Sequence, residues 1–301
     1  MLNITAYSRV WLSIFAGLVI ASIASVAIFG LNFGIDFTGG SVIEVTATNI
    51  TTDEVRALAQ EAGVEATVQR SGENGFILRS ATLTEEQHQA VLDTLRAKAP
   101  DLTEQRFDAV GPSVGEELRR SSIVAVILLL VLIAVYIAFA FRQVSVPVAS
   151  WKYATVTAIA ALHDVLVPLG VFAILGKVAG YQVDTAFVAA LLTILGYSIN
   201  DTIVVMDRTR ENLFRHRHSG KTFAEIVNQS LWETMGRSVN TTVTTLLPLL
   251  AILFFGGDTT RPFILALIIG IVAGAYSSIF VASPLLVLWE KWGGAQVKDS
   301  K

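Results

Sequence analysis

An amide and a carboxylate interrupt an apolar stretch in the second half of the chain. Asn200 and Asp201 lie between Leu191–Ser198, which is apolar or small, and Ile203–Met206, which is fully apolar. A charged Asp at the centre of a membrane helix costs about 2.5–3.5 kcal/mol, so such residues usually face a bundle interior or a wet cavity. A carboxyl group in low-dielectric surroundings can pick up and release a proton near neutral pH. The pattern indicates a proton relay.

Two other apolar segments also carry polar side chains. On one of them a polar stripe follows i, i+3, i+4, i+7 spacing, which places it on one helix face. Its members are Arg237, Asn240, Thr241 and Thr244. On the segment at 151–176 the supporting polar residues are His163 and Asp164. Tyr197 supports Asp201 on its own segment. Three successive helices would thus line one shared interior site.

A structural interpretation of the same residues stays open. In it Asp201 pairs with Arg237, and the amides and hydroxyls only hold the helices together. In the relay interpretation each charge moved through 100 mV supplies about 2.3 kcal/mol, enough to drive a conformational cycle. Both interpretations need the same residues, so the sequence does not separate them.

Other candidate sites are weaker. Ser219–Thr222 resembles the end of a phosphate loop, but Arg215 occupies the position of the required first glycine. Thr222 and Glu225 instead predict a capping box that starts a helix on the inner membrane surface. His216 and His218 lie among arginines and suit a solvated basic loop better than a metal site. His88 is expected to be solvated, and with no cysteine and no nucleophile–base pair we expect no enzyme and no metal site.

The elements that must position the polar residues are membrane helices. The chain is 53% hydrophobic and 16% charged, against about 25% charged residues in soluble domains. A membrane helix needs about 20 apolar residues. Six segments qualify: 10–30, 121–141, 151–176, 185–206, 238–257 and 263–289.

The distribution of basic residues predicts the orientation of these spans. Lys and Arg concentrate in the 207–238 loop and the C-terminal tail, and such loops stay in the cytoplasm. Both termini are therefore expected to be cytoplasmic. This divides the chain into residues 1–30 with the first span, an extracytoplasmic domain at 31–120, and five further spans at 121–301.

The extracytoplasmic domain shows the pattern of a small α+β fold. Its expected elements are strands at 41–48, 65–70, 75–80 and 102–110 and helices at 52–62 and 84–97. This β-α-β-β-α-β order is that of a ferredoxin-like domain. Glycines flank the junctions with the first and second spans, where they would form a hinge or simply a tight entry to the first strand. They are Gly30, Gly34, Gly39, Gly40, Gly111 and Gly115.

Four stretches together resemble one family. They are GLNFGIDFTGGSVIEV at 30–45, VGPSVGEEL at 110–118, ALHDVL at 161–166 and GYSINDTIVVMDRTREN at 196–212. They are similar to SecF, the protein-export membrane subunit of the SecD/SecF family in the RND (resistance–nodulation–division) superfamily. The resemblance covers nearly the whole chain, and the last motif is its strongest part.

The resemblance implies a function and partners. In this family SecF works with SecD beside the SecYEG channel, and the pair uses the proton gradient to help draw unfolded preproteins across the bacterial cytoplasmic membrane. A fourth-span aspartate serves proton transfer, a position held here by Asp201, and a fifth-span arginine corresponds most nearly to Arg237. YajC and YidC are further candidate partners, membrane lipid surrounds the spans, and no nucleic acid or cofactor is implied. Na⁺ is an alternative coupling ion.

Two rival functions remain open at this stage. One is an RND-type exporter half for lipids or small molecules that uses the same relay. The other is a scaffold of the translocation channel in which Asp201 matters only through packing. An intramembrane hydrolase based on His163 and Asp164 is a remote third, because no nucleophile accompanies them.

Overall fold

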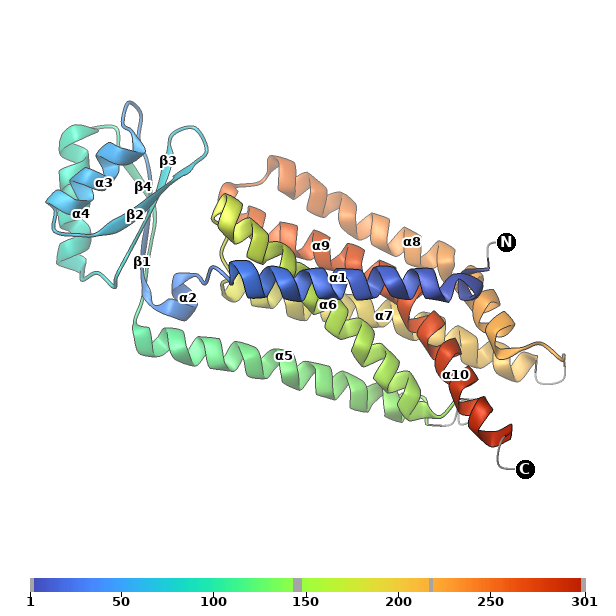
Figure 1. The fold of residues 1–301 in the computed structure, drawn as a ribbon. Coiled ribbons are helices and arrows are strands. Elements are labelled where there is room, and N and C mark those ends of the chain that lie inside the picture. Colours follow the sequence, from blue (N-terminus) through green and yellow to red (C-terminus); the bar gives the residue numbers. More distant parts are fainter. Residues whose placement is uncertain (1–2, 143–147, 217–218, 299–301) are drawn as a thin grey trace. The chain divides into compact units, whose positions relative to one another are not determined.

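The computed structural model describes residues 3–142, 148–216 and 219–298, which form two compact units (Figure 1). The bundle unit comprises Met1–Asn32, Ala125–Tyr181 and Ala186–Lys301. The α+β unit comprises Phe33–Val124 together with Gln182–Thr185. Each unit is described by itself.

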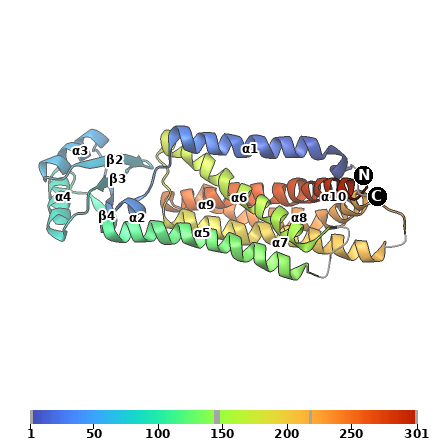
Figure 2. The ribbon, with the colours of Figure 1, turned by 60° about the horizontal axis from the view of Figure 1, so that its bottom comes forward.

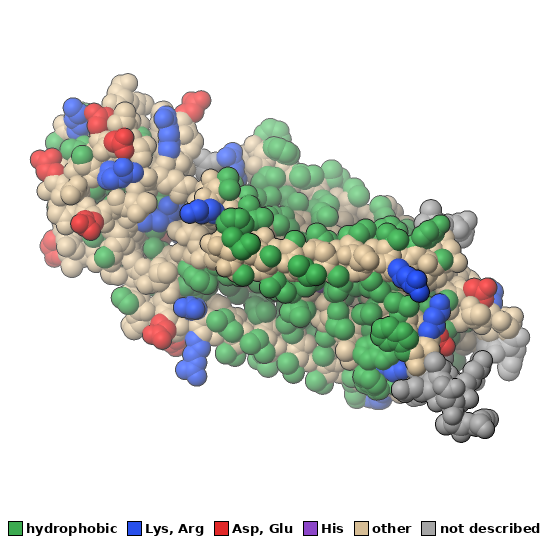
Figure 3. Space-filling view, in the orientation of Figure 1, with side chains coloured by type: hydrophobic (Ala, Val, Ile, Leu, Met, Phe, Trp, Pro, Cys, Tyr) green, Lys and Arg blue, Asp and Glu red, His purple; other side chains and the backbone are tan. Residues whose placement is uncertain are grey.

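Six helical segments are long and apolar enough to cross a membrane, which confirms the predicted number of spans. The first five contain α1 (Ser8–Phe29, after the short η1 at Ile4–Tyr7), α5 (Pro112–Ala140), α6 (Ser150–Ala179), α7 (Thr185–Arg215) and α8 (Phe223–Phe255). The sixth, preceded by η2 (Asp258–Thr260), joins α9 (Arg261–Ser277), a π-helix η3 (Ser278–Ala282) and α10 (Ser283–Lys298). Apolar side chains cover these helices in the space-filling view (Figure 3).

Helices α6, α7 and the last span form the centre of the bundle unit. About half or more of the side chains in their most apolar windows are buried, whereas α1, α5 and α8 are mostly exposed along theirs. Helix α6 packs against both α1 and α9, and α8 also packs against α9 (Figure 2). Neighbouring helices thus bury several polar residues of α6, α7 and α9, among them Asp164, Ser198 and Ser277.

Small residues bring the central helices close together. A Cβ at Gly170 of α6 would lie 2.5 Å from Ser22 Cα of α1. On α9, a Cβ at Gly274 would lie 2.7 Å from Ser198 Cβ of α7. Such close approach of backbones is the usual way in which membrane helices gain packing contacts. The contact between Gly274 and Ser198 restricts how α7 is rotated about its own axis.

The fifth span differs from the prediction at its start. The Thr222–Glu225 capping box is present. The helix it starts is not a separate surface helix, however, because α8 runs without a break from Phe223 to Phe255. Its first apolar residues are buried within the chain. They are Phe223, Ile226, Val227 and Leu231. Burying this stripe stabilises a continuous helix, whereas the sequence pattern had suggested that it faces lipid.

The α+β unit contains the predicted ferredoxin-like fold. After a short α2 (Ile35–Thr38), it is built from β1 (Gly40–Thr46), α3 (Thr52–Glu61), β2 (Ala66–Ser71), β3 (Gly75–Ser80), α4 (Glu85–Lys98) and β4 (Thr103–Val110). The four strands form one antiparallel sheet of order β2-β3-β1-β4. Helices α3 and α4 lie together on one face of this sheet (Figure 1).

The core of the α+β domain lies between its sheet and its two helices. Alternate residues of β1 and β3, such as Ile43, Val45 and Phe76, are buried against Val55 of α3 and Leu92 of α4. Both helices begin with the capping boxes that their sequences encode, at Thr51 and at Thr84. The alternating apolar residues of the strands and the apolar faces of the helices therefore form one core layer.

The expectation for His88 is wrong. Its side chain is buried, stacks on Phe107 with ring centroids 3.8 Å apart, and places Nε2 2.8 Å from Glu104 Oε1. The sequence shows a polar residue near the start of a helix, which suggested solvent exposure. The aromatic ring on β4 and the carboxylate beside it supply an apolar face and a hydrogen-bonding partner, and these allow the imidazole to be buried.

Candidate functional site

Asp164 is the centre of a buried polar cluster in the bundle unit. Its side chain is 0% exposed. Oδ2 accepts hydrogen bonds from Ser198 Oγ of α7 at 2.5 Å and from Ser277 Oγ of α9 at 2.9 Å. Oδ1 lies 2.9 Å from His163 Nδ1. One carboxylate thus joins three helices, and both of its oxygens are satisfied.

His163 completes this cluster on its apolar side. The imidazole is 1% exposed and stacks on Phe15 of α1, with ring centroids 5.1 Å apart. Its Nε2 atom has no hydrogen-bond partner among the residues that the structure describes. An unsatisfied buried ring nitrogen is costly, so this side of the cluster carries a polar atom whose hydrogen bonding is incomplete.

A second layer of hydroxyls continues the cluster toward the π-helix. Thr202 Oγ1 lies 2.9 Å from Ser278 Oγ, and Ser278 Oγ donates to the Ser198 carbonyl at 3.1 Å. Single π turns inside α-helices occur frequently at functional sites. The sequence analysis did not select these residues. The i, i+4 spacing of Ser198 and Thr202 beside Asp201, and the Ser277–Ser278 pair within a charge-free span, were the available signals.

Asp201 occupies a different environment from Asp164. Its side chain is only 3% exposed, yet Oδ2 makes no hydrogen bond to any described residue. Ser238 and Arg237 of α8 are polar neighbours of Asp201, and the Ser238 hydroxyl likewise has no hydrogen-bond partner among the described residues. No ion pair joins Asp201 to Arg237 within the described parts of the chain. A buried carboxyl with a free oxygen is equipped to bind and release a proton.

The remaining predicted relay residues make no hydrogen bond to the Asp164 cluster among the described residues, and the Tyr197 hydroxyl is buried without a partner there. Asn200, Arg237, Asn240 and Thr244 are exposed, while Tyr197 and Thr241 are half-buried. The hydroxyls of Thr241 and Thr244 donate to carbonyls of their own helix, four residues earlier. The single interior site expected from the sequence is therefore two sets: a buried cluster around Asp164, and an outward-facing polar face of α7 and α8 beside Asp201.

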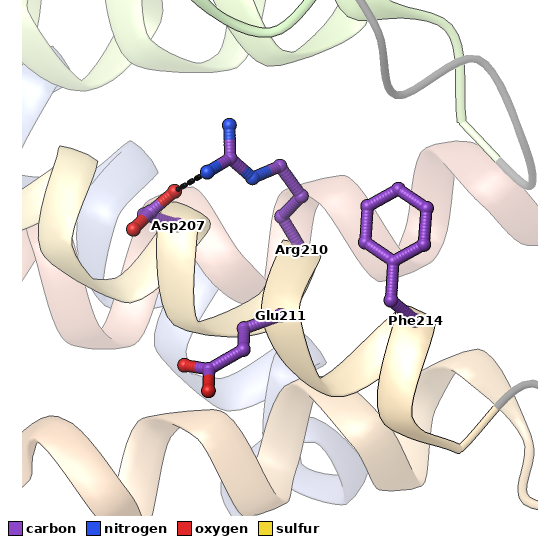
Figure 4. A pocket seen from close by; sticks show the side chains of 4 residues that line it. All are labelled: Asp207, Arg210, Glu211 and Phe214. Carbon is purple, nitrogen blue, oxygen red and sulfur yellow. Dashed lines mark ion pairs between the residues drawn. The ribbon is translucent and has the colours of Figure 1, made fainter.

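The C-terminal part of α7 carries a surface hollow of about 400 Å³. It is lined by Asp207, Arg210, Glu211 and Phe214, all on this helix (Figure 4). Arg210 pairs with Asp207 at 2.7 Å. The hollow contains ion pairs between neighbouring turns and has no convergent polar groups aimed at a ligand, so we assign no chemistry to it. His218 lies outside the described residues.

The glycines at the junction are packed closely. Gly39 has φ +72°, and a Cβ there would lie 2.9 Å from Pro112 Cα. Gly40 has φ +130°, and a Cβ would lie 2.7 Å from the Ser80 carbonyl oxygen. A Cβ at Gly115 would lie 2.9 Å from the Gly39 nitrogen, whereas Gly111 has open space around it. Gly39 and Gly40 therefore allow both a positive φ angle and a close approach of the neighbouring backbone.

Comparison with known proteins gives a consistent result. Residues 90–292 match the family model described as protein export membrane protein SecD/SecF, C-terminal, and residues 24–49 match the SecD/SecF GG motif. The protein translocase subunit SecF of Thermobaculum terrenum is 47% identical over 277 residues, covering 87% of this chain and 86% of the relative. SecF of Anaerolinea thermophila is 38% identical and covers 96% and 94%.

The solved structures agree in fold. The crystal structure of SecDF from Thermus thermophilus, a translocon-associated membrane protein, superposes with a TM-score of 0.84 at 36% identity. It covers 96% of this chain, and this chain covers 39% of it. SecDF in its super-membrane-facing form gives a TM-score of 0.72 at 36% identity.

Proposed function

The chain belongs to the SecD/SecF family as a SecF subunit of the protein translocase, and from this we propose that it uses the proton motive force to assist preprotein export. In this proposal Asp201 is the group that takes up and releases the proton. The observation that carries it is the buried Asp201 carboxyl whose Oδ2 has no hydrogen bond among the described residues. Asp164, with both oxygens satisfied, would instead hold the central helices in register.

The exposed polar face of α7 and α8 supports a partner within the membrane. Arg237 and Asn240 are exposed on α8, and an uncovered Arg at the centre of a membrane helix costs about 2.5–3.5 kcal/mol. No Cβ contact would be met at Gly196 or Gly236, so this face is open in the isolated chain. SecD is the partner that we propose to cover it, since this chain matches only part of a fused SecDF.

The orientation follows from the same proposal. Both termini and the turn that joins α7 to α8 lie in the cytoplasm, and the α+β domain lies on the outer side of the bacterial cytoplasmic membrane. There it would contact the emerging preprotein as SecD and SecF work beside SecYEG. Protonation and deprotonation of the Asp201 carboxyl would change the packing of α7 and so move the domain that handles the preprotein.

Inverted membrane vesicles test this function. They would contain the channel and SecD, with or without this chain, and ATP would be held constant. We expect a proton gradient to increase the rate of preprotein export only when this chain is present, and a protonophore to abolish the increase. A sodium ionophore that abolishes it instead would assign the coupling to Na⁺. An increase caused by the chain that is the same with and without the gradient would favour the scaffold function, and an equal rate with and without the chain would contradict both functions.

A further inference from the structure

The entry segment of the α+β domain (Phe33–Gly40) is fastened to the start of α7. Phe33 forms a parallel bridge with Val183, and Gly34 N donates to the Val183 carbonyl at 2.9 Å. Asp36 Oδ2 accepts a hydrogen bond from Thr185 N at 3.0 Å and another from Thr185 Oγ1. We call these contacts the clasp. They join residues that are about 150 positions apart in the sequence.

The clasp supplies a hydrogen-bond acceptor to the N-terminus of α7. The first N–H groups of a helix have no acceptor within the helix, and a carboxylate placed there also interacts favourably with the helix dipole. Asp36 supplies this carboxylate to the first residue of α7. The same helix continues without a break to Asp201, 16 residues or about 24 Å further along.

The entry segment is held equally firmly on its other side. Phe37 is buried, and the Gly39 and Gly40 backbone packs against Pro112 and Ser80 too closely for any side chain. Arg119 of α5 lies over the Phe33 ring at 5.3 Å. The segment therefore has contacts both to the body of the α+β domain and to Val183 and Thr185, the latter being the first residue of α7.

We infer that the clasp makes the entry segment and the start of α7 move as one body, so that the helix carrying Asp201 drives the α+β domain directly. This inference rests on the proposed function, because it names the connection through which a protonation change reaches the preprotein-handling domain. Asp36 is a positioning residue in this account. It takes no part in proton transfer.

Asp36→Ala and Thr185→Val remove the side-chain part of the clasp. In the vesicle assay we expect either substitution to reduce gradient-stimulated export at least several-fold, and Asp36→Asn, which keeps an acceptor oxygen, to restore part of it. Asp101→Ala is the matched control. Asp101 Oδ2 accepts from Thr48 N and Thr48 Oγ1 in the same way, but within the α+β domain and away from α7. Full stimulation in Asp36→Ala would overturn the inference.

A reversible cross-link gives the opposite test. A Cβ at Gly34 would lie 3.2 Å from Asp184 Cβ, close to the 3.5–4.5 Å of a disulfide, and the chain has no cysteine of its own. We expect Gly34→Cys combined with Asp184→Cys, when oxidised, to keep the stimulation and to rescue Asp36→Ala. Stimulation that is lost on oxidation and recovered on reduction would show that the segments separate in each cycle, and would overturn the inference.

Hydrogen exchange of the purified full chain separates this inference from the proposed function. We expect Asp36→Ala to accelerate exchange at residues 33–38 and in the first turn of α7 together. Acceleration in only one of the two segments would count against the clasp. If wild-type vesicles show no gradient stimulation, the proposed function fails, and the clasp is judged by the exchange result alone.

Discussion

At the scale of single residues, two buried aspartates differ in how well they are satisfied. Asp164 receives hydrogen bonds from Ser198 and Ser277 and has His163 at its second oxygen. Asp201 leaves one oxygen without any hydrogen bond to the described residues. A fully bonded buried carboxylate rigidifies its surroundings, whereas an incompletely bonded one leaves room for a change of protonation state. This contrast is the basis for assigning structure to one and proton transfer to the other.

The structural role of Asp164 predicts a loss of stability on substitution. Asp164→Asn turns one accepting oxygen into a donor that faces hydroxyl donors, so we expect the full chain in detergent to lose about 1–3 kcal/mol of unfolding free energy. Thermal unfolding followed by circular dichroism would measure this. Ser277→Ala removes only one bond and should cost less. An unchanged melting temperature in Asp164→Asn would show that the cluster contributes nothing to stability.

Asp101 gives the α+β domain a predicted pH dependence. Hydrogen bonds from the Thr48 hydroxyl and backbone N–H lower the pKa of Asp101 below its usual value of about 4. A lowered folded-state pKa stabilises the fold above pH 4, and this stability is lost as the pH falls through the lowered pKa. Asp101→Asn should flatten the acid limb of domain stability, measured by hydrogen exchange between pH 5 and 2. An identical acid limb would contradict this.

At the scale of elements, close helix crossings determine which side chains meet. Gly170 allows α6 to contact α1 at Ser22, and Gly274 brings α9 against Ser198. Without the Gly274 contact α7 could rotate about its axis, and Ser198 would no longer reach Asp164. The buried cluster is therefore a consequence of glycine positions on neighbouring helices.

The crossing of α1 and α6 can be tested with a matched pair of substitutions. Gly170→Ala places a Cβ 2.5 Å from Ser22 Cα, and we expect the overpacked crossing to cost about 1–3 kcal/mol. Gly17→Ala on α1 meets nothing within 4 Å and should be neutral or slightly stabilising. The melting temperatures of both variants in detergent would be compared with that of the wild type. Equal melting temperatures would mean that the crossing relaxes without cost.

The element patterns could be predicted from the sequence because they are local. The six apolar spans, the ferredoxin-like order and the capping boxes at Thr84 and Thr222 follow from composition and periodicity. The division of the polar residues into two sets could not be predicted. It depends on how α7 is rotated against α9, which is fixed by packing between distant segments. His88 was misjudged for the same reason, because it lies on α4 whereas Phe107, on which it stacks, comes from β4.

At the scale of the whole molecule, orientation in the membrane remains a prediction. We expect a reporter fused after Lys301 or inserted between α7 and α8 to be active only in the cytoplasm, because basic residues concentrate around both positions. A reporter inserted at Gly72, on the hairpin between β2 and β3, should be active only on the outer side. An outer C-terminus would reverse the assignment of the basic loop and of the α+β domain.

The whole account depends on one carboxyl group. Asp201 is buried on the helix whose first residue is bound by Asp36, and it lies beside the polar face that we assign to SecD. If Asp201 exchanges a proton with each cycle, α7 transmits the change along its length and through the clasp. If the role of Asp201 is purely structural, the account contains no group in this chain that binds the transferred proton.

The most direct test is the Asp201→Asn variant in inverted vesicles with SecD and the channel. The substitution removes the titratable proton and nearly preserves the shape of the side chain. At constant ATP and equal membrane levels of the protein, we predict that the variant loses the gradient-dependent increase in preprotein export while it keeps the basal rate and its assembly with SecD. An increase equal to that of the wild type would contradict the relay and leave Asp201 with a structural role.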